Sequence, residues 1–115
     1  MKTQAELIDE IAWRRRPREA ILEDLRLFES ASDIFILPLS AVTEIIDLRI
    51  AGKIPEKEVV EWANFFECRD EVHYQEKERD IILKAIFLLA NSEINCPLTE
   101  ANLRMIRREC ENHEN

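Results

Sequence analysis

The chain has 115 residues, and its 24 acidic residues outnumber its 16 basic residues, which leaves a net charge of −8. A chain of this length builds one domain whose core needs neither metals nor disulfides. A surface with this charge repels nucleic acid and anionic membranes, so it either suits a cationic partner or serves solubility alone.

Composition also limits the fold and the compartment. One glycine and four prolines leave few tight turns, which favours helices over a many-turned sheet. Three cysteines do not fit a small secreted disulfide framework. The amino end lacks the apolar core of a signal peptide, and the longest apolar run, Ala85 to Ala90, is too short to cross a bilayer. We therefore predict an all-α fold, a single compact helical bundle of about five or six helices over residues 1–115, in the cytoplasm.

The first two helices are predicted on either side of Pro17. Thr3 followed by Glu6 matches a capping box, and apolar residues recur at helical spacing up to Arg16. Proline is favoured in a first helical turn, so a second helix begins at Pro17. An arginine-rich run surrounds this break, and it is either a nucleic-acid contact or, as the acidic neighbours favour, a set of ion pairs across helix turns. The run consists of Arg14, Arg15, Arg16 and Arg18.

The next segment, DIFILPL over Asp33 to Leu39, is apolar and β-branched. We interpret it as an extended buried linker, because no second convincing strand is present to pair with it and Pro38 removes a hydrogen-bond donor. Ser40 is then the predicted N-cap of a third helix.

The third and fourth helices are predicted to form an antiparallel pair around the only glycine, Gly52. Glycine suits the left-handed position after a helix, and Pro55 opens the next one. Arg49 projects from an apolar arc, and we predict that it bridges to Glu58 or Glu61. We predict that Asp70 faces the N-terminus of the third helix, where the dipole favours an anion.

A highly charged break, DEVHYQEKERD over Asp70 to Asp80, precedes the fifth helix. That helix is apolar on nearly every side between Ile81 and Ala90, so we expect it to be buried on nearly every side at the centre of the bundle. Thr99 is predicted to cap the last helix.

No catalytic or metal-binding signature emerges. Cys68, His73, Cys110 and His113 could supply four ligands, but the first two do not converge on one helix face. Neither histidine has a partner pattern for nucleophilic catalysis, and one glycine cannot build a phosphate loop. We expect no enzyme, no metal and no cofactor.

The strongest surface feature is an acidic block between Ile54 and Asp80, where nine acids face four bases. It is either a solvated face or a docking surface for a basic partner, whose association the charge would accelerate. The candidate partner-binding residues are Glu61, Glu67, Asp70, Glu71, Glu76, Glu78 and Asp80.

Two segments carry a resemblance to a known class of proteins. They are the helix–GKI–helix segment AVTEIIDLRIAGKIPEKEVVEWANFF and the closing segment ANSEINCPLTEANLRMIRREC. The chain resembles small helical immunity proteins of bacterial toxin systems, namely the colicin D immunity family and the immunity proteins of contact-dependent growth inhibition. The resemblance implies a non-catalytic inhibitor that plugs the active site of a toxin, often a tRNA-cleaving nuclease.

Charge leads independently to the same partner, because a nuclease active site is cationic and an acidic protein can cover it. The alternative is a helical interaction or regulatory module that is unrelated to toxins, such as an adaptor or a self-associating protein. Exposed Trp13 or Phe65 would favour this alternative, because large exposed apolar patches mark interfaces.

Overall fold

Six α-helices and two short strands form the domain within residues 2–28, 34–67, 69, 71–92 and 97–114, which are those that this computed structural model describes. The helices are α1 (Gln4–Ala12), α2 (Arg18–Leu25), α3 (Leu39–Ile50), α4 (Glu56–Glu67), α5 (Arg79–Ala90) and α6 (Glu100–Glu114). The strands are β1 (Phe35–Leu37) and β2 (Val72–Tyr74), and a 3-10 turn, η1 (Glu76–Glu78), precedes α5. The predicted all-α bundle is confirmed.

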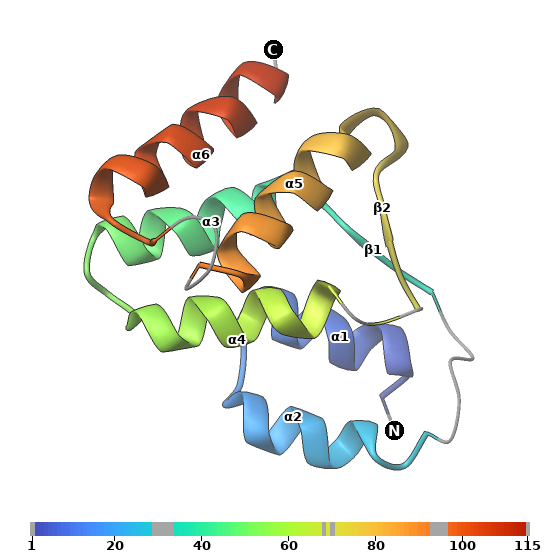
Figure 1. Cartoon of the computed structure of the whole chain (residues 1–115). Helices are drawn as coiled ribbons and strands as arrows, with labels where there is room; N and C mark the ends of the chain where they lie inside the picture. The colour runs from blue at the N-terminus through green and yellow to red at the C-terminus, as the bar shows by residue number, and fades with distance from the viewer. Residues whose placement is uncertain (1, 29–33, 68, 70, 93–96, 115) are drawn as a thin grey trace.

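The core lies where α5 crosses α4, and α3 and α6 pack against this pair, while α2 lies at the periphery beside α1 (Figure 1). Trp62 and Phe66 of α4 are fully buried there, with ring centroids 4.9 Å apart. α6 packs on α3 and α5, while α1 packs on α2 and β1. The main partner of α4 is therefore α5, although α3 and α4 run in opposite directions from the Gly52 turn as predicted.

Local capping signals position several helix ends. The capping box at α1 is confirmed, with the Glu6 backbone N–H donating to Thr3 Oγ1 and the Thr3 N–H donating to Glu6. The hydrogen bonds with the Thr3 backbone and then its side chain hold the pKa of Glu6 below its ordinary value of 4.5. Thr99 also caps α6 as predicted, because its Oγ1 accepts from the Asn102 N–H at 3.1 Å.

Two turns in the described residues use left-handed backbone. Gly52 has φ 73°, as predicted for the end of α3. Arg14, just after α1, has φ 54° despite its side chain, a conformation that costs a non-glycine residue about 1 kcal/mol. The sequence contains no local signal for this second turn.

The prediction that residues 33–39 form an unpaired linker is wrong for its central part. β1 pairs in parallel with β2, with Phe35 opposite Val72 and Leu37 opposite Tyr74. The partner strand lies inside the charged break, where only three residues alternate in exposure, so its pattern is too short to recognise.

Two other local predictions also fail. α3 begins at Leu39 after Pro38, so Ser40 lies in the first turn and is not the N-cap. α5 is not buried on nearly every side, because Leu83 and Phe87 are 37% and 48% exposed. α3, α4 and α6 cover its other faces and leave this one open.

Arg49 does not bridge to α4. Its Nη1 donates to the Ile54 carbonyl oxygen at 3.0 Å, so the hydrogen bond joins the end of α3 to the residue two positions after Gly52. Glu58 and Glu61 are occupied instead by Arg14 and Arg18, which come from the amino-terminal part of the chain. Asp70, the other half of that prediction, lies outside the described residues.

Candidate functional site

The predicted acidic block divides into two regions that lie on different sides of α4. Its first acids face the arginine-rich turn between α1 and α2, and its last acids lie on the connection from β2 to α5. In Figure 1 this connection forms a protruding corner, far along the molecule from α2. The chain therefore does not present the predicted residues as one continuous face.

The first region is neutralised by cations. Glu58 pairs with Arg14 at 2.7 Å, and Glu61 pairs with both Arg18 and Lys57. Arg14 and Arg18 of the arginine run are ion-paired, as predicted, but the prediction that their partners are neighbouring carboxylates across helix turns is wrong, because both partners lie on α4. Glu61 is consequently the least suitable of the described candidates for attracting a distant cation.

Glu71 is also unsuited to a direct contact. It is only 7% exposed, and its carboxylate accepts a hydrogen bond from Arg69 Nε. The Arg69 guanidinium lies 4.7 Å from the centre of the Phe65 ring, so the pair is held between the end of α4 and β2. Glu71 stabilises this junction and is buried away from solvent.

Two of the remaining described candidates, Glu67 and Glu76, line a groove beside β2, which we call the β2 groove. It has a volume of about 690 Å³ and is lined by residues that include Glu67, Arg69, His73, Tyr74, Glu76 and Leu83. The phenol of Tyr74 donates to the Phe66 carbonyl oxygen at 3.2 Å, which ties β2 to the end of α4. Glu67 accepts a hydrogen bond from the Asn91 side chain.

Three acids in η1 and the first turn of α5 have no ion pair within the part of the chain that the structure describes. Glu76 and Asp80 are exposed, and Glu78 is half-buried. Asp80 lies in the first turn of α5, where the helix dipole favours a carboxylate. These three charges are therefore available to a cationic partner.

Apolar side chains lie beside these acids. Leu83 lines the β2 groove, and Phe87 follows one helical turn later on the same open face of α5. Exposure of Trp13 or Phe65 would favour a general interaction module. Both side chains are half-buried and pack against the core, so neither forms an exposed patch. The sequence pattern of α5 contained this apolar face, but it did not show that no other helix covers it.

No group of three potential metal ligands occurs among the residues that the structure describes. Cys68 lies outside them, and so does the side chain of His113, while Cys110 is buried in the core. Of the helices described, none is both long enough and apolar enough to cross a membrane. The acid–apolar corner at β2 and α5 is the surface feature that remains.

Comparisons of the chain with protein-family models, with curated proteins and with solved structures found no match.

Proposed function

We propose that this protein is a non-catalytic immunity protein, which binds a basic toxin domain of the nuclease type and covers its cationic active site. One observation carries the proposal: three acids that have no ion pair among the described residues, Glu76, Glu78 and Asp80, lie next to the open apolar face of α5. Carboxylates at this corner would replace the phosphates of a nucleic-acid substrate, and Leu83 and Phe87 would supply the apolar contact.

Charge and apolar surface contribute to different parts of the binding. Complementary charges steer encounter and can raise the association rate constant from about 10⁵–10⁶ to about 10⁸ M⁻¹s⁻¹ or more at low salt. Buried apolar contacts act mainly on the dissociation rate. A toxin must be blocked before it cleaves its substrate, so fast association is the property that an inhibitor of this kind requires.

The direct test is growth rescue. The reading frame next to the one for this chain is expected to encode a toxin with a basic nuclease domain. Expression of that domain alone should arrest bacterial growth, and coexpression of this chain should restore it. A neighbouring toxin that still arrests growth in the presence of the folded chain would contradict the proposal.

Charge reversal at the corner should slow binding to that domain. The double variant Glu76→Lys/Glu78→Lys is expected to lower the association rate constant about tenfold at about 0.01 M salt, where the Debye length is about 30 Å. The difference should shrink near 0.15 M salt, where charges are screened beyond about 8 Å. Surface plasmon resonance at both salt concentrations measures this.

The matched control is Glu19→Lys/Glu44→Lys, which changes the net charge equally. Both residues are exposed acids on α2 and α3, and neither has an ion pair among the described residues. If the control slows association as much as the corner variant, net charge alone matters and the assignment of the corner is wrong.

A self-associating helical module is the second candidate, and the exposed Leu83 and Phe87 are the observation that favours it. Light scattering after size-exclusion chromatography distinguishes the two functions. A dimer that Phe87→Ser converts to a monomer, without growth rescue, would support this second function over the first.

A further inference from the structure

The turn between α1 and α2 encloses a pocket that the proposed function does not use. It has a volume of about 320 Å³, and the four arginines of the run line it together with Glu58 and the edge of Trp62. This size lies at the lower end of the range for small-molecule sites, about 300–1,000 Å³. We call it the arginine pocket.

Carboxylates around the turn pair with three of the guanidinium groups, and one of these carboxylates, Glu58, itself lines the pocket. The pairs are Arg14–Glu58, Arg16–Glu10, Arg16–Asp24 and Arg18–Glu61. These hydrogen bonds use the Nε and Nη2 atoms of Arg14 and Arg16, and Nη2 of Arg18. Within the described residues, none of them uses Nη1. Each of these groups therefore keeps N–H donors that these carboxylates do not use, and a guanidinium group with spare donors can bind an oxyanion.

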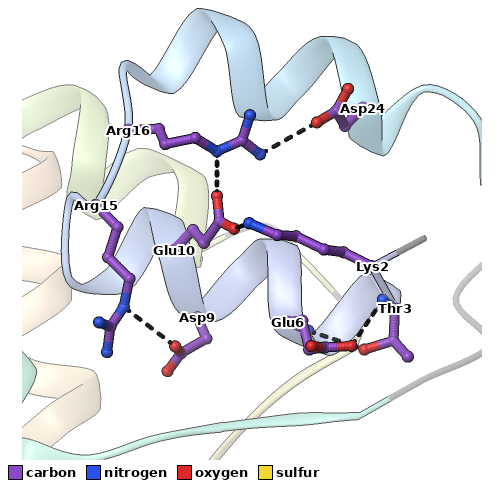
Figure 2. A network of polar contacts seen from close by, with 8 residues as sticks. All are labelled: Lys2, Thr3, Glu6, Asp9, Glu10, Arg15, Arg16 and Asp24. Atoms are coloured by element: carbon purple, nitrogen blue, oxygen red, sulfur yellow. Dashed lines mark hydrogen bonds and ion pairs between the residues drawn. The ribbon is translucent and has the colours of Figure 1, made fainter.

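The fourth arginine is held less firmly. The Arg15 side chain is 60% exposed, and its Nε lies 3.5 Å from an Asp9 oxygen, a distance of weak attraction (Figure 2). Its backbone is well placed, because the Arg15 N–H donates to the Glu10 carbonyl oxygen at 2.9 Å. Arg15 can therefore move onto a ligand without disturbing the turn. Figure 2 shows that Arg15 and Arg16 point in different directions, with Arg16 directed toward Asp24.

The local charge favours an anion although the protein as a whole is acidic. The pocket lining contains four arginines and one carboxylate, Glu58, and the ion pairs around the turn form four separate groups that join six cations to five carboxylates. The cations are Lys2, Arg14, Arg15, Arg16, Arg18 and Lys57, and the carboxylates are Asp9, Glu10, Asp24, Glu58 and Glu61. A long nucleic acid would meet the net charge of −8 over the whole surface. A small anion meets mainly the charges within about 8 Å of it.

We propose that the arginine pocket binds a compact phosphate-bearing small molecule, with the N–H donors of Arg14 and Arg18 that their ion pairs leave unused donating to its oxygens and Arg15 closing over it. Guanidinium groups match phosphate oxygens in geometry, and Trp62 also lines the pocket. The site is independent of the corner proposed to bind a toxin, so either proposal can fail without the other.

The test uses inorganic pyrophosphate as the probe and the full-length chain. Isothermal titration should give saturable one-to-one binding with a dissociation constant below about 1 mM. Amide NMR shifts should cluster at residues 14–18 and at the Trp62 indole N–H. Arg15→Gln is expected to weaken binding at least tenfold while the melting temperature stays within error, because this side chain is mostly exposed.

Arg108→Gln is the matched control, because Arg108 is an exposed arginine on α6 without an ion pair in the described part of the chain. Its affinity for pyrophosphate should equal that of the unmodified protein. Arg14→Gly is a second variant, since glycine retains the left-handed turn without the guanidinium.

The proposal is overturned if binding is not saturable, if both Arg15→Gln and Arg14→Gly bind normally, or if Arg108→Gln weakens binding equally. Tighter binding of a short single-stranded RNA than of pyrophosphate would also overturn it. AMP and adenosine form the last pair of probes: AMP should bind, and adenosine, which lacks the phosphate, should not.

Discussion

Trp62→Ala is expected to destabilise the protein by about 3–5 kcal/mol, the usual cost of truncating a buried aromatic residue to alanine. Trp62 is 2% exposed and packs on Phe66 at the centre of the bundle. Its indole N–H also donates to the Ala12 carbonyl oxygen at 3.2 Å, which satisfies an acceptor left open at the end of α1. Because a domain of this size is stable by only about 5–15 kcal/mol, this variant should lie close to unfolding.

Urea denaturation measures this loss of stability. Unfolding is followed by circular dichroism in place of tryptophan fluorescence, because the variant removes one of the two tryptophans. The matched variant Trp62→Phe keeps most of the ring volume and loses the N–H donor, so it should cost about 1–2 kcal/mol. If the two variants were equally stable, the hydrogen bond rather than the packing of the indole would be the important contribution. If Trp62→Ala cost under about 1 kcal/mol, α4 would not be the centre of the core.

Glu10→Ala is the second large expected effect, at about 2 kcal/mol. Figure 2 shows the Glu10 carboxylate between Lys2 and Arg16, and Arg16 continues to Asp24 on α2. Glu10 is 5% exposed, so its charge is almost fully removed from water. Hydrogen bonds to charged groups contribute about 1.5–3 kcal/mol each, but the two cations remain partly solvated and regain water when the carboxylate is lost. This recovery places the expected cost near the lower end of that range.

Asp9→Ala is the control for Glu10, because Asp9 is the adjacent acid on α1 and pairs with an exposed arginine, Arg15, at 3.5 Å. Exposed pairs of this kind contribute about 0–1 kcal/mol, so this variant should stay within about 0.5 kcal/mol of the unmodified protein. Chemical denaturation near neutral pH compares the two. Equal stability losses in both variants would show that the burial of Glu10 adds nothing to its ion pairs.

The division of the acidic block changes what can be tested at the candidate site. Glu71 and Glu61 form internal pairs, so their reversal would disturb the fold as well as any partner. Glu76 and Glu78 have no ion pair among the described residues and can be reversed with less structural effect. The structure thus selects the variants that separate binding from stability.

The features that could be predicted from the sequence are the local ones. Helix ends are marked by Thr3 with Glu6, by Gly52 and by Thr99. The two threonines accept hydrogen bonds from backbone N–H groups three residues later, and Gly52 adopts the left-handed backbone after α3, as predicted. Apolar periodicity likewise indicated the helices, because each helical face repeats over a few turns. These signals depend only on neighbouring residues, so they can be recognised before the fold is known.

The tertiary structure decided the features that join distant parts of the chain. β1 finds its partner 37 positions later in the register of Phe35 with Val72, and Arg14 reaches Glu58 across 44 positions. Neither contact has a local pattern. The exposure of Phe87 and the burial of Glu71 also have no local sequence pattern, because burial depends on which elements pack nearby. The sequence alone determined an acidic helical bundle, whereas the packing of its elements determined which acids pair internally and which remain unpaired at the surface of the described residues.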